Sequence, residues 1–501
     1  MATEIELKYL VFSNNTTEII SSLLSKNNIE FIESTTQLGN CYFDTPDLNL
    51  RKHDMGLRIR EKDGLLEQTI KTAGKVVGGL HQRPEFNIPI TVKQPDLSLF
   101  PAEIWASTQT YQTIQSQLVS LFTTDFKRHI WLINTARSGV VEVVFDLGEV
   151  SSNGLVDPIC EIELELVRGD VSELFELAEL FLTELDLRPG LKSKAARGYG
   201  LWGGVKATAK CSPLTLLPIK SSDKISDAFI GGLTHTLGHL QKSVDYYIDK
   251  PALSALAVIK ETLSLMEHGF LFFEDHLVAE LTDVKNELAY FARVFSWVEH
   301  LIYLKEIVNK TGNYRKKINY SEELVTALKL EKRRFPDIDE VKQIFHSQRF
   351  NQLQLSILKM LMPNQKLFTP NADDTRMISF ATAQLSKSLN VLENAMSECK
   401  SLTSDQYLEH APLLNTTLHT GIWFAGLFEE EERTKYRAPW LDIREGINEL
   451  QVLWLIQKQL KRLPEQPEKL VNWQSSKVDN LLHALDHSKQ SAMSTQPYWL
   501  Y

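Results

Sequence analysis

Several short segments of this sequence carry acidic and basic residues at every second position. In the first of them, Glu4, Glu6 and Lys8 alternate with Ile5 and Leu7. Successive side chains of a strand point to opposite faces, so this spacing places three charges on one face. Removing such groups from water is costly unless each meets a counter-charge or a metal ion. The pattern predicts either a solvated strand face or a polar site for a charged ligand.

The same spacing recurs along the first two hundred residues. The other sets are Arg58 and Arg60, Thr69 and Lys71, Arg83 and Glu85, and Glu161, Glu163 and Glu165. This recurrence favours one shared site over separate solvated faces. Carboxylates bind hard divalent cations such as magnesium or manganese, whereas arginine and lysine bind phosphate oxygens. A phosphate chain that carries a divalent metal would neutralise both kinds of group at once.

The elements that would position these residues are mostly strands. Period-two runs cover residues 4–11, 37–43, 56–62, 67–71, 85–90, 127–134, 140–147 and 160–167, and helical patterns cover 17–26, 111–121 and 171–185. Eight strands with few crossover helices predict a closed antiparallel barrel. Because alternate residues of a small barrel point inward, the charged sets would line one lumen.

A second region with a different pattern of apolar residues follows. Glycines, small residues and prolines predict a linker over residues 204–218, between a first domain at 1–203 and a second at 219–501. Long helical patterns cover residues 225–247, 251–271, 277–308, 321–330, 335–361, 372–398, 404–428, 440–463 and 469–487. The predicted fold class is therefore an α+β multidomain protein, with an eight-stranded antiparallel barrel followed by an all-α bundle.

Composition excludes several function classes. The net charge of -10 disfavours nucleic-acid binding by bulk charge. No run approaches the roughly 18 apolar residues of a membrane helix, and no signal peptide is recognisable. The four cysteines have no paired spacing, which argues against a zinc site or a disulfide framework and favours a reducing cytoplasm. They are Cys41, Cys160, Cys211 and Cys399. Neither nucleic acid nor a membrane is expected as a partner.

Several motifs, in family order, resemble the CYTH superfamily, also called triphosphate tunnel metalloenzymes. They are Glu4–Lys8 (EIELK), Tyr42–Thr45 (YFDT), Gly56–Arg60 (GLRIR), Gln68–Thr72 (QTIKT), His81–Phe86 (HQRPEF), Cys160–Leu166 (CEIELEL) and Lys192–Tyr199 (KSKAARGY). The resemblance implies an eight-stranded tunnel that binds a triphosphate group and hydrolyses it with a divalent metal.

The resemblance also implies roles for individual residues. The implied metal ligands are Glu4, Glu6, Asp146, Glu161 and Glu163. The implied phosphate ligands are Lys8, Arg58, Arg60, Lys71, Arg83, Arg128 and Lys194. The implied catalytic residues are Glu4, Glu6, Lys8 and Lys71. For Glu85 and Glu165, a role as arginine partner and a role as metal ligand stay open.

Residues 219–501 resemble CHAD, a helical domain that often follows CYTH, and His346–Leu358 is the best local match. CHAD helices carry rows of histidine and arginine that are thought to bind polyphosphate. The corresponding stretches here, residues 253–273 and 413–428, have lost nearly all their basic residues. A bundle with a structural or partner-docking role is therefore favoured over a degenerate CHAD domain that still binds polyphosphate.

The leading hypothesis is an enzyme that resembles bacterial inorganic triphosphatases. It would hydrolyse inorganic triphosphate to diphosphate and orthophosphate with magnesium or manganese as cofactor, and longer polyphosphate is a further candidate ligand. One alternative is a polyphosphate-binding module without turnover. Another is a CYTH-type adenylyl cyclase or organic triphosphatase, although no segment predicts the apolar pocket that an organic group would need.

Overall fold

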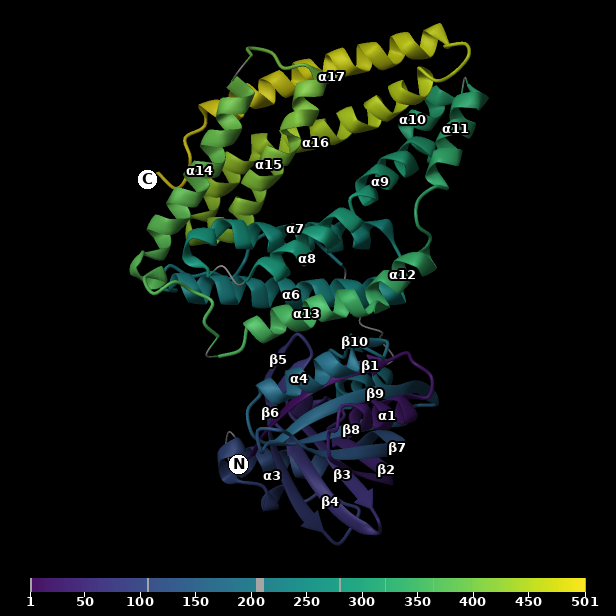
Figure 1. Ribbon diagram of the computed structural model, residues 1–501, viewed down its shortest axis with the longest axis vertical. Coiled ribbons are helices and arrows are strands. Elements are labelled where there is room, and N and C mark those ends of the chain that lie inside the picture. Colours follow the sequence, from purple (N-terminus) through teal and green to yellow (C-terminus); the bar gives the residue numbers. More distant parts are fainter. Residues whose placement is uncertain are drawn as a thin grey trace. The chain divides into compact units, whose positions relative to one another are not determined.

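The computed structural model describes residues 2–105, 108–203, 211–278, 281–319, 321–363, 365–397 and 399–500. It contains two compact units (Figure 1). The first combines residues 1–210 with residues 342–360, and the second combines residues 211–341 with residues 361–501. Part of the predicted linker, residues 204–210, lies outside the described residues. The predicted domain division at residues 203 and 219 stays a prediction.

The first unit is built on one antiparallel sheet. Its described strands are β1 (Ala2–Val11), β2 (Phe31–Asp44), β3 (Gly56–Lys62), β4 (Leu65–Lys71), β5 (Lys75–Val77), β6 (Leu80–Ile90), β7 (Val119–Asn134), β8 (Val140–Ser152), β9 (Leu155–Arg168) and β10 (Leu187–Pro189). They follow the order β10-β1-β9-β8-β7-β2-β3-β4-β6-β5, and β1 also pairs with β6. That last pairing closes eight strands into a barrel, so the predicted fold class is confirmed.

Two kinds of boundary were predicted wrongly. The expected helix over residues 111–121 runs too far, because α3 (Thr108–Gln117) ends before β7, whose first residues pair with the end of β2. The expected single helices over residues 277–308 and 335–361 are each two helices. A short turn between two amphipathic helices can preserve the spacing of their apolar residues, so periodicity alone does not reveal the break.

Helices and apolar side chains fill the space around the strands. On the outside, Trp131 of β7 is fully buried and donates a hydrogen bond to Ser21 of α1 (Thr16–Lys26). On the inside, Leu38, Phe126 and Ile159 form an apolar cluster with Tyr199 of α5 (Lys194–Trp202). Helix α5 packs on β7, β8 and β9 and carries Lys194 at its first position. The packing of this helix therefore fixes one of the predicted phosphate ligands.

Two glycines of α5 offer a matched test of that packing. A β-carbon at Gly198 would lie 2.1 Å from Phe122 Cδ2, whereas a β-carbon at Gly200 would meet nothing within 4 Å. We expect Gly198→Ala to lower the free energy of unfolding by about 1–3 kcal/mol, because α5 must move away from the barrel. Gly200→Ala should be neutral or stabilise the protein by up to about 1 kcal/mol. Urea denaturation of the two variants measures the difference, and equal stabilities would contradict this account of α5.

Residues 342–360 belong to the barrel unit although the helical region surrounds them in sequence. They contain α13 (Gln348–Met360), which packs on β10 and on α4 (Ser172–Phe181). Lys359 Nζ lies 2.7 Å from Glu179 Oε1, and the rings of Phe12 and His346 are 4.1 Å apart. A fragment that ends at residue 203 would therefore lack one of the helices that cover the barrel.

The second unit is helical among its described residues. Its α-helices are α6 (Ile225–Asp249), α7 (Leu253–Phe272), α8 (Thr282–Val294), α9 (Trp297–Val308), α10 (Asn313–Ile318), α11 (Glu322–Lys332), α14 (Met377–Ser397), α15 (Ser404–Phe424), α16 (Glu430–Leu460) and α17 (Glu468–Ser494), and α12 (Ile338–His346) crosses the boundary between the units. Trp423 is fully buried and contacts Gly232 and Gly269, where a larger residue would clash. No helix among the described residues has the length and apolarity that a membrane span requires.

Candidate active site

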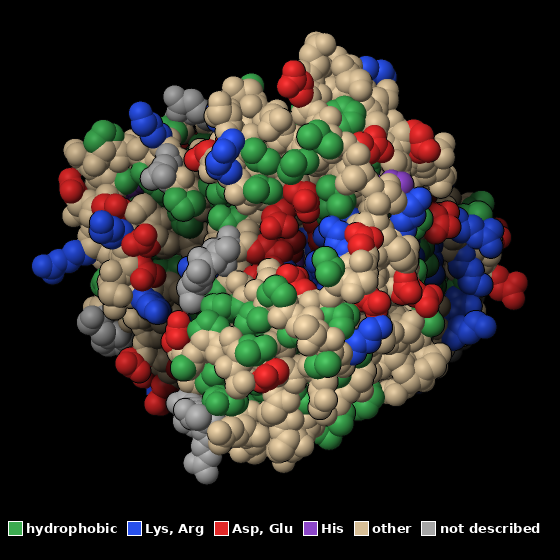
Figure 2. All heavy atoms as spheres, turned by 90° about the horizontal axis from the view of Figure 1, so that it is seen from below, with side chains coloured by type: hydrophobic (Ala, Val, Ile, Leu, Met, Phe, Trp, Pro, Cys, Tyr) green, Lys and Arg blue, Asp and Glu red, His purple; other side chains and the backbone are tan. Residues whose placement is uncertain are grey.

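The strand register brings the charged faces together inside the barrel. Lys8 on β1 lies opposite Glu163 on β9, and Arg128 on β7 lies opposite Asp146 on β8. Asp146 in turn lies opposite Glu161. Seen from below the barrel, acidic and basic side chains gather in a hollow with hydrophobic side chains around it (Figure 2). The lumen therefore holds charges of both signs, as the alternating sequence predicts.

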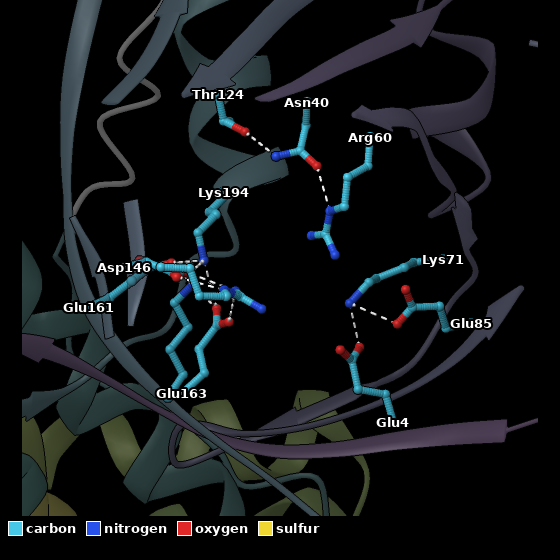
Figure 3. Close-up of polar contacts among 12 residues, drawn as sticks. Glu4, Asn40, Arg60, Lys71, Glu85, Thr124, Asp146, Glu161, Glu163 and Lys194 are labelled. Carbon is cyan, nitrogen blue, oxygen red and sulfur yellow. Dashed lines mark hydrogen bonds and ion pairs between the residues drawn. The ribbon is translucent and has the colours of Figure 1, made fainter. Parts of the chain in front are cut away.

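Lys194 lies at the centre of the most densely charged part of the lumen (Figure 3). Its Nζ is 2.7 Å from Asp146 Oδ2, 2.6 Å from Glu161 Oε1 and 3.0 Å from Glu163 Oε1. Burial disfavours the charged lysine, but these carboxylates outweigh burial and raise the pKa of Lys194. The ammonium therefore stays charged and neutralises part of the acidic cluster.

Lys8 and Arg128 complete this cluster. Lys8 Nζ is 2.6 Å from Glu161 Oε1 and 3.1 Å from Glu163 Oε1. Arg128 donates two hydrogen bonds to the carboxylate of Asp146, at 2.7 Å and 2.6 Å, and a third to Glu163 at 3.1 Å. Burial opposes ionisation of Glu163, but Lys194, Lys8 and Arg128 together hold its pKa well below the usual value. Arg197 Nη1 also lies 3.5 Å from Glu161 Oε2, so four cations of the described residues contact these three carboxylates.

A second group of ion pairs lies across the lumen from the first (Figure 3). Lys71 Nζ of β4 is 2.5 Å from Glu4 Oε2 and 3.1 Å from Glu85 Oε2. Arg58 donates a hydrogen bond of 3.2 Å to Glu85. Burial alone would raise the pKa of Glu85, but Lys71 and Arg58 lower it. Glu85 is therefore a partner of these cations, which favours the first of the two roles left open for it.

Glu6 and Glu165 differ from the other lumen carboxylates. They lie directly opposite each other on β1 and β9, and within the described residues neither has an ion pair with a lysine or arginine. Burial and the nearby Glu163 raise the pKa of Glu6 to about 8. Burial and Glu4 raise the pKa of Glu165 to about 7. Opposed like charges destabilise a sheet, so this pair favours a bound proton or a bound cation.

A divalent metal fits the two acidic regions differently. Carboxylate oxygens of Asp146, Glu161 and Glu163 lie within 4.8 Å of one another, as metal ligands do. However, Lys194 Nζ already contacts all three, so a metal there would have to displace the ammonium. Among the described residues, Glu6 and Glu165 lie opposite each other without an ion pair to such a cation. A divalent cation at Glu6 would therefore not have to displace an ammonium, whereas the cluster of Asp146, Glu161 and Glu163 has the closer set of oxygen ligands.

Two predicted phosphate ligands carry no ion pair in the part of the chain that the structure describes. Arg60 lies on β3, where burial, Arg58 and Arg128 lower its pKa to about 10. Its Nε donates a hydrogen bond of 2.9 Å to Asn40 Oδ1. Arg83 lies opposite Glu4 on β6, and its Nε is buried without a hydrogen-bond partner. Both guanidinium groups thus keep charge that an anion can neutralise.

All twelve predicted site residues lie on the barrel strands or at the start of α5. Sequence reasoning missed Asn40 and Thr124, which are buried polar residues of the lumen. Asn40 lies two residues before Tyr42 on the face that carries the YFDT motif, so its position on that face was a usable signal. Thr124 lies outside every period-two run and gave no comparable signal.

Comparisons with known proteins agree with this geometry. The CYTH domain family model matches residues 2–199. An inorganic triphosphatase of Haemophilus influenzae is 40% identical over 204 residues, which are 40% of this chain and 55% of that relative. The chain thus spans about half the length of the curated relative that it matches.

Solved structures with similar folds give weaker likenesses. The Hippeastrum protein HpAC1, described as having a dominant triphosphatase activity, is 21% identical over 39% of this chain and 95% of its own, with a TM-score of 0.29. A CHAD domain from the plant Ricinus communis is 12% identical over 57% of this chain and 98% of its own, with a TM-score of 0.39. Both scores are below 0.5, so the assignment depends on the family match and the Haemophilus relative. The CYTH domain family model thus matches the part of the chain that forms the barrel and most of α5.

Proposed function

We propose that the barrel hydrolyses inorganic triphosphate to diphosphate and orthophosphate with a divalent metal. The observation that carries the proposal is a closed barrel whose lumen combines acidic pairs with partly unneutralised arginines. The CYTH family match and the Haemophilus inorganic triphosphatase support it. Glu4, Glu6, Asp146, Glu161 and Glu163 are the candidate metal ligands; carboxylate oxygens of the last three lie within 4.8 Å of one another, and Glu6 lies opposite Glu165.

The basic residues of the lumen would act by binding and charge neutralisation. Phosphoryl transfer to water passes through a loose transition state with charge spread over the phosphate oxygens, so positioning and neutralisation supply most of the catalysis. Arg60 and Arg83 can bind phosphate oxygens without first breaking an ion pair. Lys8, Arg58, Lys71, Arg128 and Lys194 must exchange carboxylate partners for phosphate oxygens.

The candidate carboxylates of the lumen would hold a magnesium or manganese ion, which would supply positive charge against the phosphate and lower the pKa of water. A bound cation would also relieve the repulsion between Glu6 and Glu165, which the strand register holds opposite each other. Burial of the same groups excludes bulk water and strengthens each charge interaction in the lumen. The helical unit would be a structural or docking bundle at residues 219–501, and a cytoplasmic location is part of the same proposal.

A substrate panel tests this function. With magnesium or manganese, the full chain should release orthophosphate from tripolyphosphate far faster than from ATP. EDTA should stop the release, because the phosphate charge and the carboxylates then lack their shared cation. Comparable rates on tripolyphosphate and ATP would overturn the assignment of the inorganic substrate.

One observation supports a second candidate, an organic triphosphatase. Ile32 lies on the face of β2 that carries Asn40, and Leu65 lies on the face of β4 that carries Lys71. Both are highly exposed, at 67% and 76%, so these lumen faces end in apolar side chains. An apolar rim of this kind could contact an organic group at one end of a triphosphate. The panel therefore includes thiamine triphosphate, and a cyclic AMP assay with ATP tests the cyclase alternative.

Replacing Glu4 and Glu6 with glutamine separates an enzyme from a polyphosphate-binding module. An enzyme should lose turnover in the double variant, whereas a binding module should change only its retention of polyphosphate.

The helical stretches that lack basic rows, residues 253–273 and 413–428, form α7 and α15. Where these helices meet, His419 Nε2 lies 2.9 Å from Glu261, so an acidic group is present at a position where a polyanion would need cations.

A further inference from the structure

We propose that Asn40 is a positioning residue that holds the Arg60 guanidinium ready for a phosphate chain, and that Thr124 fixes Asn40. This inference rests on the proposed function, because it concerns how the lumen orients Arg60, one of the predicted phosphate ligands. Nothing in the charged motifs indicates it, because Asn40 and Thr124 are both uncharged.

Three adjacent strands place these residues in one row (Figure 3). Asn40 on β2 lies opposite Arg60 on β3 and opposite Thr124 on β7. Asn40 Oδ1 accepts a hydrogen bond of 2.9 Å from Arg60 Nε, and Asn40 Nδ2 donates one of 2.9 Å to Thr124 Oγ1. Asn40 is 3% exposed and Thr124 is 1% exposed. The row is therefore a buried chain of hydrogen bonds that ends at the guanidinium.

The chemistry of the donors fixes the direction of this chain. Arg60 Nε can only donate, so the carbonyl oxygen of the Asn40 amide must face it. The amide nitrogen then faces Thr124, whose hydroxyl oxygen accepts its hydrogen. Because Asn40 uses only Nε of Arg60, the two terminal nitrogens of the guanidinium stay available, and Figure 3 shows that end of the side chain pointing into the lumen. A guanidinium presented in this way can bind two phosphate oxygens.

The charge of Arg60 explains why an amide is suitable at position 40. The cations Lys8, Arg58, Lys71, Arg128 and Lys194 all have carboxylate partners within 3.2 Å. Arg60 has none among the described residues, and it lies near Arg58 and Arg128. A carboxylate at position 40 would orient Arg60 equally well but would neutralise it. An amide orients the guanidinium and leaves its positive charge for the substrate.

A double-mutant cycle tests the proposal on the full chain. Asn40→Ala should raise the KM for tripolyphosphate, and its Kd measured by calorimetry in EDTA, by about tenfold, since the hydrogen bond that orients the Arg60 guanidinium is lost and no charge is added. In an Arg60→Ala background, Asn40→Ala should change neither constant more than about twofold, because the group through which Asn40 acts is absent. Thr124→Ser should behave like the wild type, and Thr124→Val should weaken binding.

The outcomes distinguish this proposal from others. An effect of Asn40→Ala that persists in the Arg60→Ala background would show that Asn40 acts independently of Arg60, and would overturn the proposal. Unchanged KM and Kd in folded Asn40→Ala protein, with melting curves as the check on folding, would overturn it as well. Absence of turnover in the wild type would instead contradict the proposed function, while the calorimetric cycle would still decide the role of Asn40.

Discussion

Glu6→Gln should abolish turnover of tripolyphosphate and, in the metal-free protein at alkaline pH, make the barrel more stable. The activity is lost because an amide is a poorer ligand for a divalent metal than a carboxylate and carries no negative charge to balance the metal. The stability gain has a different cause. Ionised Glu6 lies opposite Glu165 without a cation partner in the described structure, and an amide removes this repulsion.

The sign of the pH dependence follows from the pKa of Glu6, which burial and Glu163 raise from its usual 4.5 to about 8. Between these values the folded protein keeps a proton that the unfolded chain has released. The contribution of Glu6 to stability is therefore present at low pH and is lost as the pH rises towards 8. In EDTA, the melting temperature of the wild type should fall more steeply across this window than that of Glu6→Gln.

Thermal melting with and without metal measures the change in stability, and orthophosphate release from tripolyphosphate measures the loss of turnover. Glu18→Gln is the matched control, because Glu18 is an exposed glutamate of α1. The control should keep full activity and the pH profile of the wild type. Added magnesium or manganese should stabilise the wild type at high pH more than it stabilises Glu6→Gln. A Glu6→Gln variant that is less stable than the wild type in EDTA at high pH would contradict this description of the lumen.

Lys194→Met should have the largest effect on stability. The change removes an ammonium that contacts Asp146, Glu161 and Glu163, of which the first two are fully buried. Breaking a buried ion pair from one side costs about 3–5 kcal/mol when the remaining charge has no other partner. Lys8 and Arg128 still contact these carboxylates, so we expect a loss at the low end of this range, about 3 kcal/mol, in the free energy of unfolding, together with loss of turnover.

Lys192→Met is the matched control for this prediction, since Lys192 is exposed and only two residues away. Its stability should stay within about 0.5 kcal/mol of the wild type. Denaturant unfolding of both variants gives the comparison. If Lys194→Met unfolds like the control, the ammonium cannot hold the three carboxylates together, and a metal becomes the better candidate for the centre of that cluster.

The inward faces of the barrel could be predicted from sequence because a strand has a simple period. The alternation at Glu4, Glu6 and Lys8 and at Arg58 and Arg60 predicts which side chains share a face, and the closed sheet brings those faces together. Strand ends were harder to predict. At the starts of β2 and β7 the burial does not alternate cleanly, so no period-two run marks those residues.

Contacts between distant segments could not be predicted from a one-dimensional pattern. The distance between Lys194 and Asp146 depends on how α5 packs, which Gly198 and Phe122 decide. The pairing of Asn40 with Thr124 depends on the register of β2 and β7, which lie far apart in sequence. Residues 342–360 have the same helical period as their neighbours, so nothing in their pattern indicates that they cover the barrel.

A crystal structure of Glu6→Gln with tripolyphosphate would test most directly the claim that the barrel interior is the site of reaction. The account predicts a triphosphate in the lumen, with its oxygens within hydrogen-bond distance of Arg60 and Lys71 and with Lys71 released from Glu4. A lumen without triphosphate, at a concentration that saturates the wild type, or a triphosphate bound on the helical unit alone, would contradict it.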